Sequence, residues 1–288
     1  MVLKRTDRDA AMRTNALLIL LGLSAAVGGC TQPYMDDYRL DQGLVMVFTG
    51  IEGRGVLNED ICHGLNAGGV DWGIELVDWT IGLPFTTLLN IGSRGRNHRQ
   101  ATAIGQRIAK YRLDYPGRPV VLVGQSGGAA IAVWAAERLP AGHRVDGIIL
   151  LAAALSPEYP LDNALARSRR GIVSFHSSRD RFFLGAGTTI SGTMDGKHGS
   201  AAGRVGFTVP ADGARAGAYR RKLFQVPWRE QVYRSGLGGH LTSGSRDFVA
   251  RHVGPLCRAS LWSERTVQRV LSGQAFIRPH DPLAPTGR

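Results

Sequence analysis

The stretch that decides the fold of this chain is Val120-Val121-Leu122-Val123-Gly124-Gln125-Ser126-Gly127-Gly128-Ala129-Ala130. Its four apolar, mostly β-branched residues predict a buried strand, and an alanine-rich helical pattern runs from Gly127 to about Leu139. Between them, Gly-x-Ser-x-Gly places Ser126 at the apex of a tight strand-to-helix turn. The glycines permit a strained backbone, and the helix N-terminus points partial positive charge at any anion beside the serine. The pattern indicates a nucleophilic serine; the alternative is a glycine-rich turn with a passive one.

Strands and helices alternate along the rest of the chain. Apolar or alternating runs predict five further strands, at residues 44–49, 74–79, 145–152, 171–176 and 223–228. Helical spacing predicts helices at 97–115, 161–166 and 245–253, with one more helical turn at 267–271. Asn97 is the expected cap of the first of these helices. Residues 182–218, rich in glycine, serine and threonine, predict an irregular excursion. This order is typical of an α/β fold with a mostly parallel central sheet and helices on both faces.

Two further side chains could complete a catalytic set with the serine. A serine hydroxyl needs a base, normally a histidine that a carboxylate orients. His240 follows the last expected strand, and two glycines before it let the loop bend tightly; His198 in the glycine-rich excursion is the rival. Asp180 follows the strand at 171–176, and Asp195, further along the same connection, is the alternative acid. Ligands of parallel sheets gather at these carboxyl ends of strands.

These residues resemble the α/β-hydrolase superfamily of serine esterases and lipases. The resemblance covers most of residues 42–257 and is carried by the elbow at Gly124–Gly128 and by the chain order Ser126, Asp180, His240. It implies an eight-stranded, mostly parallel sheet. It also implies a two-step acyl transfer through an ester on Ser126, with Asp180 as orienting acid and His240 as base.

The resemblance further implies an oxyanion hole built from two backbone N–H groups. One is that of Gly127, the residue after the nucleophile. The other comes from the loop after an earlier strand, where many esterases carry His-Gly and this chain has Thr49-Gly50. Gly50 lets the chain turn so that the N–H of Ile51 can point at the oxyanion. Each such donor contributes about 2.7–4 kcal/mol to the transition state.

The expected activity is that of a serine hydrolase on an ester, thioester or amide, with a small-molecule or acyl substrate. An acyltransferase on the same scaffold is one alternative, because hydrolysis and transfer share the first half-reaction. A hydrolase-fold binding protein without turnover is another, although an intact set of serine, aspartate and histidine argues against it.

The first thirty residues predict an export signal rather than part of the fold. Four basic residues precede an apolar core at 16–27, and small residues lead into Cys30. The segment resembles a bacterial lipoprotein signal, which implies a lipid on Cys30 and anchoring to a membrane of the bacterial envelope, periplasmic or surface-facing. An ordinary secretory signal and an uncleaved anchor are the alternatives.

Four segments are therefore expected along the chain. These are a signal peptide (1–29), a tether (30–41), one α/β-hydrolase domain (42–258) and a partly disordered C-terminal extension (259–288).

The formal net charge of +12 does not by itself identify a partner. The arginines are scattered, and no aromatic residues interleave with them in a recognisable motif, so no nucleic acid is expected. Anionic lipid or envelope polysaccharide is the expected neighbour of an exported basic protein.

Cysteine usage fits export and gives no support to a metal site. There is no Cys-x-x-Cys and no His-x-x-x-His, so neither a metal nor a cofactor is expected. With Cys30 assigned to lipid, Cys62 and Cys257 suggest one disulfide in an oxidising compartment. Two separate buried thiols are the alternative.

Overall fold

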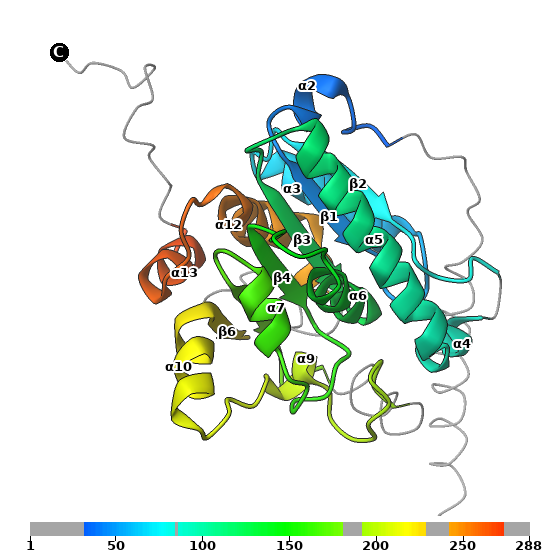
Figure 1. The fold of residues 1–288 in the computed structure, drawn as a ribbon, viewed down its shortest axis with the longest axis vertical. Coiled ribbons are helices and arrows are strands. Elements are labelled where there is room, and N and C mark those ends of the chain that lie inside the picture. The colour runs from blue at the N-terminus through cyan, green and yellow to red at the C-terminus, as the bar shows by residue number, and fades with distance from the viewer. Residues whose placement is uncertain (1–31, 84–85, 181–191, 229–241, 274–288) are drawn as a thin grey trace, which may run out of the picture.

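One parallel sheet forms the centre of the molecule. The computed structural model describes residues 32–83, 86–180, 192–228 and 242–273 (Figure 1). Six strands pair in the order β2-β1-β3-β4-β5-β6, and each neighbouring pair is parallel. The strands are β1 (Leu44–Phe48), β2 (Gly73–Val77), β3 (Val120–Gln125), β4 (Gly147–Leu151), β5 (Ile172–His176) and β6 (Leu223–Pro227).

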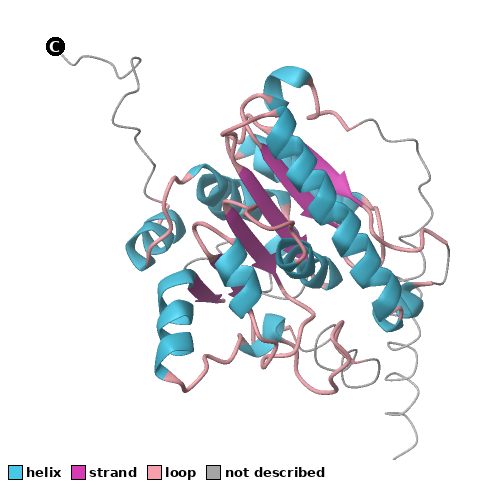
Figure 2. Ribbon diagram, viewed as in Figure 1, coloured by secondary structure: helices cyan, strands magenta, loops and turns pink. Residues whose placement is uncertain are grey.

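Helices cover both faces of this sheet (Figure 2). The α-helices are α2 (Asp37–Leu40), α3 (Val56–Ala67), α4 (Thr87–Gly92), α5 (Arg94–Asp114), α6 (Gly127–Glu137), α7 (Asp162–Arg167), α9 (Ala202–Val205), α10 (Gly213–Lys222), α11 (Arg246–Phe248), α12 (Gly254–Arg258) and α13 (Glu264–Leu271). A 3₁₀ turn, η2 (Thr242–Gly244), and a π-helical segment, η3 (Val249–Val253), flank α11. In Figure 1, α5, α6 and α7 lie in front of the sheet, and α3 and α12 lie behind it.

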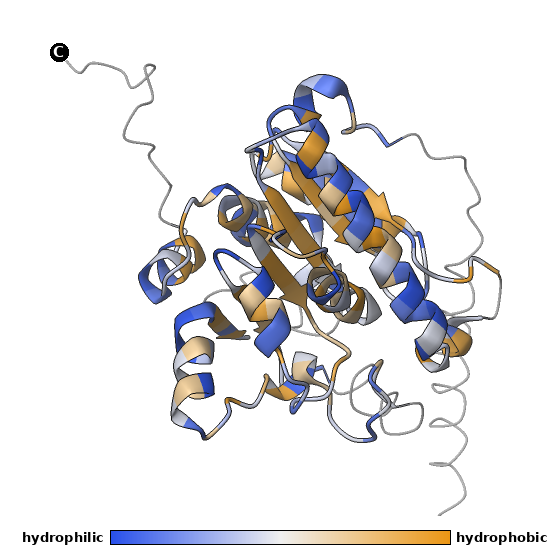
Figure 3. Ribbon diagram, in the orientation of Figure 1, coloured by the Kyte–Doolittle hydropathy of each residue, from blue (hydrophilic) through white to orange (hydrophobic). Residues whose placement is uncertain are grey.

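Alternate side chains of each strand fill two separate apolar layers. On β1, Met46 and Phe48 belong to the layer shared with α5 and α6, whereas Val45 and Val47 belong to the layer shared with α3 and residues 248–257. Because both faces are covered, β1, β3 and β4 at the centre of the sheet are nearly continuous apolar runs rather than alternating ones (Figure 3). That is why the strands could be located in the sequence.

The structure corrects two expectations, one about the number of strands and one about the start of α5. Six strands, not eight, lie within the described residues. The helix expected to begin at Asn97 begins at Arg94, with Ser93 as its N-cap residue. Asn97 is instead buried inside that helix, where its amide donates to the carbonyl of Asn90 at 2.6 Å. The polar side chain ties α5 to α4 and does not cap a helix end.

Five of the described helices were not expected, namely α2, α3, α4, α9 and α10, and one expected helix is divided. No pattern in the sequence predicted α3. Helix α10 lies partly in the excursion expected to be irregular, although Asp212 caps it by accepting the N–H of Arg215 at 2.9 Å. The helix expected at 245–253 is α11 followed by η3 and α12. There α3 approaches so closely that a Cβ on Gly68 would lie 2.7 Å from the carbonyl oxygen of Ala250. The widened π turn coincides with this contact.

Segments before and after the sheet also pack against it. Gln32 and Tyr34 accept hydrogen bonds from the N–H groups of Leu76 and Ile74 on the outer strand β2. At the other end, α13 buries one apolar face in the core. Within the described residues, none of the helices combines the length and the apolar character that crossing a bilayer requires.

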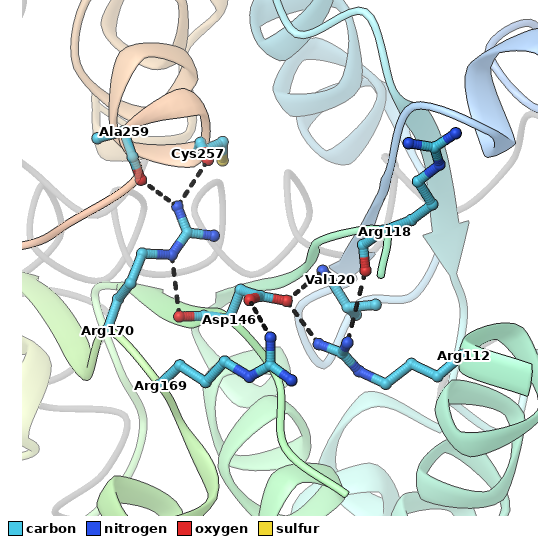
Figure 4. Close-up of polar contacts among 8 residues, drawn as sticks. All are labelled: Arg112, Arg118, Val120, Asp146, Arg169, Arg170, Cys257 and Ala259. Carbon is cyan, nitrogen blue, oxygen red and sulfur yellow. Dashed lines mark hydrogen bonds and ion pairs between the residues drawn. The ribbon is translucent and has the colours of Figure 1, made fainter. Parts of the chain in front are cut away.

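A buried ionic network closes the amino-terminal edge of the sheet, opposite the end where Ser126 lies (Figure 4). The Asp146 carboxylate, just before β4, accepts from Arg112 at 2.5 Å and from the first N–H of β3, on Val120, at 2.8 Å. The exposed Arg169 adds a contact at 3.5 Å. These contacts fix the two strands that lead to the serine turn.

Next to this carboxylate, a buried arginine joins the sheet to the C-terminal helices. Arg170 donates to the carbonyls of Asp146 at 3.0 Å and Cys257 at 2.9 Å, and also to that of Ala259. Its guanidinium lies 5.2 Å from the ring centroid of Trp262.

Candidate active site

Ser126 lies at the sharp turn between β3 and α6 that the sequence predicted. Its φ of 53° and ψ of −119° are values that residues other than glycine rarely adopt. Such a conformation costs about 1–3 kcal/mol and persists only where the surrounding structure over-determines it. The N–H of Ser126 donates to the carbonyl of Leu151 at 2.9 Å, which ties the turn to β4.

The glycines of the turn are required by close backbone packing. A Cβ on Gly128 would overlap the carbonyl oxygens of Phe48 and Thr49 at the end of β1. A Cβ on Gly124 would overlap the carbonyl oxygen of Gly128. Glycine at these two positions therefore allows β3 and α6 to meet at so sharp an angle, directly against β1.

A second left-handed residue adjoins the first. Ala152, immediately after β4, has a φ of 50°. Two residues later, Ala154 donates its N–H to the carbonyl of Ser126 at 3.1 Å and accepts the N–H of Met194 at 2.9 Å. The Met194 sulfur would lie 3.4 Å from a Cβ on Gly127. Residues 152–154 and Met194 thus surround the serine turn.

The structure brings the two expected oxyanion donors, Gly127 and Ile51, side by side. A Cβ on Gly127 would lie 2.5 Å from a methyl carbon of Ile51. Gly127 is the first residue of α6, where a helical N–H has no partner within the helix. Two buried asparagines hold the other loop. Asn58 accepts the N–H of Gly50 at 3.3 Å, and Asn90 donates to the carbonyl of Ile51 at 2.9 Å.

The two candidate carboxylates lie in different surroundings. Asp180 ends the turn after β5 and is 2% exposed, and its N–H donates to the carbonyl of Ser177 at 3.0 Å. Asp195 is occupied by Ser156: one carboxylate oxygen accepts the Ser156 N–H at 2.9 Å, and the other accepts its hydroxyl at 2.5 Å. Asp195 therefore fastens the loop after β4 to the 192–208 segment.

The described histidines do not supply an evident base, and His240 lies outside the described residues. His198 is exposed and lines a surface cavity. His176 ends β5, where burial lowers its pKa and favours the neutral ring.

The chain that follows His240 returns to the serine turn. The side-chain amide nitrogen of Gln125, the residue before the serine, would lie 3.3 Å from a Cβ on Gly244 in η2. Both Gln125 Oε1 and Ser243 Oγ are buried, without a hydrogen-bond partner among the residues described. The segment two to four residues after His240 therefore packs against the residue that precedes the nucleophile candidate.

Some features near the serine turn were not predicted from the sequence. Trp79 is buried and donates its ring N–H to the carbonyl of Thr49 at 2.7 Å, beside the oxyanion loop.

A cavity of about 410 Å³ lies between the loop at 156–158 and residues 193–208. Serine, threonine, lysine and phenylalanine are loop or core residues in most proteins, so composition gave no signal for this cavity. Across the described ranges, His, Cys, Asp and Glu form no group of three or more that could hold a metal ion.

The disulfide suggested by the sequence is not present. Cys62 on α3 and Cys257 on α12 are both buried free thiols. Both belong to the same apolar layer behind the sheet, where they pack as small hydrophobic side chains. Burial raises the pKa of each thiol to about 12, so neither is a reactive thiolate near neutral pH.

Comparison with known proteins finds neighbours only among solved structures. No family model matches the chain, and no curated protein sequence matches it. Aspergillus fumigatus lipase B is 11% identical with a TM-score of 0.48, over 83% of this chain and 58% of the lipase. The RedJ thioesterase of the Streptomyces coelicolor prodiginine pathway is 13% identical with a TM-score of 0.37, over 79% and 96%. The NocB thioesterase domain of the nocardicin cluster is 17% identical with a TM-score of 0.36, over 74% and 93%.

The fold itself is defined by the arrangement described above. A parallel sheet carries helices on both faces, and a glycine-flanked serine occupies a left-handed turn between a central strand and the helix that follows it. This chain has an α/β-hydrolase fold.

Proposed function

We propose that this chain is a serine hydrolase that cleaves an ester, thioester or amide through an acyl-enzyme on Ser126. The observation that carries the proposal is the strained turn of Ser126, beside the first N–H of α6, which has no partner within the helix. A passive serine in a βα turn has no need of a conformation that costs about 1–3 kcal/mol.

In the proposed reaction, the Ser126 hydroxyl attacks the carbonyl carbon while His240 takes its proton. The oxyanion accepts hydrogen bonds from the N–H groups of Gly127 and Ile51, whose loops adjoin. The imidazolium then protonates the leaving alkoxide, thiolate or amine as its bond to carbon breaks. Water then attacks the ester on Ser126 and gives a proton to the imidazole. The imidazolium returns this proton to Ser126 Oγ as the bond between Oγ and the acyl carbon breaks and the acid is released.

Asp180 is proposed as the carboxylate that orients His240. It is buried at the carboxyl end of β5, as such a group requires, whereas both oxygens of the alternative, Asp195, are engaged by Ser156. For the base, support comes from Gly244, four residues after His240, which packs against Gln125 beside the nucleophile. Four residues span at most about 14 Å, so a base at position 240 needs only a short connection from Gly244.

Covalent labelling with a fluorophosphonate tests the assignment of the nucleophile. The parent protein should be labelled and Ser126→Ala should not. Ser156→Ala is the matched control, because Ser156 is also buried at this end of the sheet but its hydroxyl is held by Asp195. Labelling that survives in Ser126→Ala, or that is lost only in Ser156→Ala, would refute the assignment.

We also propose that Cys30 carries a lipid that anchors the protein to the bacterial envelope. Support comes from the basic, apolar and small-residue order of residues 1–30. Mass spectrometry of the mature N-terminus should show acyl chains on Cys30, and Cys30→Ser should accumulate as unlipidated precursor. A mature N-terminus at another residue, without acyl chains, would contradict this.

A further inference from the structure

The segment between β2 and α5 exposes large apolar side chains at one end of the molecule. Leu83, Leu88 and Leu89 are 65%, 66% and 58% exposed, and the last two lie on α4. Single exposed leucines are common, but three within seven residues form a local apolar surface that needs an explanation.

The leucines of α4 are held on a fixed support. The side chain of the buried Asn90 accepts the N–H of Ile81 at 3.0 Å and donates to the carbonyl of Ile51 at 2.9 Å. Asn97 at the start of α5 donates in turn to the carbonyl of Asn90. The leucines therefore point outward from a helix that is bonded to the core on its inner side.

Basic residues predominate along the chain next to these leucines, although the three farthest along α5 form ion pairs with carboxylates. Residues 79–113 contain six lysines and arginines and no aspartate or glutamate. Next to α4, Arg94 and Arg99 are exposed and, across the described ranges, form no ion pair. Among the described residues, Arg94 donates to the backbone carbonyl of Asp195. The exposed leucines of α4 therefore lie next to two arginines that have no ion-pair partner among those residues.

We propose that α4 and the first turns of α5 form a docking surface for an anionic lipid bilayer. Leucines that enter the headgroup boundary, together with arginines that meet anionic headgroups, are the two contributions that hold peripheral proteins on membranes. A second copy of the chain fits less well. A two-fold contact through α4 would bring the arginines of both copies together without carboxylates between them.

The surface lies beside the candidate site, because Asn90 bonds α4 to the Ile51 loop. A bilayer at α4 would therefore bring the serine turn close to membrane-borne molecules. The docking proposal concerns binding alone, so it stands or falls independently of the chemistry proposed for Ser126.

A local fluorescent probe reports on this surface separately from residues 1–30, which remain in the chain with their apolar core. In the full chain carrying Cys30→Ser, Leu88→Cys is labelled with a polarity-sensitive dye; the matched control is Leu113→Cys, at the far end of α5 and 75% exposed. The remaining cysteines, Cys62 and Cys257, are buried. Vesicles of phosphatidylcholine with phosphatidylglycerol should shift the emission of the dye at residue 88 to the blue and leave that at 113 unchanged.

A second set of variants tests the charge. Each arginine near an anionic membrane strengthens binding roughly 5-fold, so Arg94→Gln with Arg99→Gln should weaken binding to these vesicles by about 30-fold. Arg265→Gln with Arg269→Gln on α13, at the other side of the molecule in Figure 1, should change it little.

Three results would overturn the docking proposal. The dyes at 88 and 113 could respond equally to vesicles, or the two pairs of arginine variants could weaken binding equally. The dye at 88 could also shift with protein concentration in the absence of lipid, which would identify a second copy as the occupant. Fluorophosphonate labelling of Ser126, measured in parallel, keeps this outcome separate from the proposed hydrolase activity.

Discussion

Replacing Arg170 by methionine should strongly destabilise the fold. Arg170 donates three hydrogen bonds to backbone carbonyls, of which those of Cys257 and Ala259 belong to the C-terminal helices (Figure 4). Hydrogen bonds from a charged group contribute about 1.5–3 kcal/mol each. The cost of burying the Arg170 guanidinium offsets much of the stabilisation from these hydrogen bonds. Removing the guanidinium, however, leaves the buried carbonyls without their donor. Because methionine can still pack on Trp262, we expect a net loss of about 3 kcal/mol in the free energy of unfolding.

The neighbouring Arg169 provides the control for this experiment. Its side chain is 57% exposed and reaches Asp146 at only 3.5 Å, so Arg169→Met should cost less than about 1 kcal/mol. Urea unfolding followed by tryptophan fluorescence would give both values, and the melting temperature of Arg170→Met should fall by about 10 °C. The network lies at the edge of the sheet away from Ser126, so folded molecules of both variants should label normally. Equal destabilisation by the two substitutions would refute the argument.

Three other predictions follow from buried or strained groups. Ala152→Gly should raise the free energy of unfolding by about 1 kcal/mol, because glycine adopts a φ of 50° without strain; a loss of stability in urea unfolding would contradict this. Burial raises the pKa of Glu137, which accepts the hydroxyl of Tyr159, to about 7, so its protonated form favours folding. Stability should therefore fall as pH rises from about 4.5 to about 7, by at most about 3 kcal/mol; Glu137→Gln should remove this part of the dependence, and an unchanged pH profile would exclude it. In the folded Cys30→Ser protein, Cys62 and Cys257 should not react with a thiol reagent, because both are buried. When this protein is unfolded without reductant, two thiols should titrate, whereas no titratable thiol would show that the two cysteines form a disulfide.

The sequence predicted the sheet well because its strands are buried on both faces. Continuous apolar runs such as Val120–Val123 have few alternative interpretations, and all six expected strands are present, with each end within two residues of its expected position. The serine turn was equally clear, since Gly124 and Gly128 are required by backbone contacts that any such turn makes.

Features set by tertiary contacts were harder to predict. Asn97 looked like a helix cap, but its partner Asn90 belongs to a helix that the sequence did not reveal. The spacing of Cys62 and Cys257 allowed a disulfide, whereas their actual role is to fill space in one apolar layer. Among the site candidates, burial and the contact of Asp195 with Ser156 distinguish the two carboxylates, and no sequence pattern encodes that contact.

The backbone contacts around Ser126 also bear on when the serine acquires its shape as the chain folds. Gly128 packs against Phe48 and Thr49, some eighty residues earlier. Ser126 itself is hydrogen-bonded to Leu151 on the next strand and to Ala154, three residues after that strand ends. A strained conformation persists only while all such contacts hold it, and distant pairings form late because closing long loops is entropically slow. A chain that has made β3 and α6 but has not yet paired β1 and β4 has no reason to hold its serine in the left-handed region. Ser126 would then take its strained conformation only once the sheet is assembled. The serine would become reactive after the whole sheet has folded, and not as soon as residues 124–128 have been synthesised.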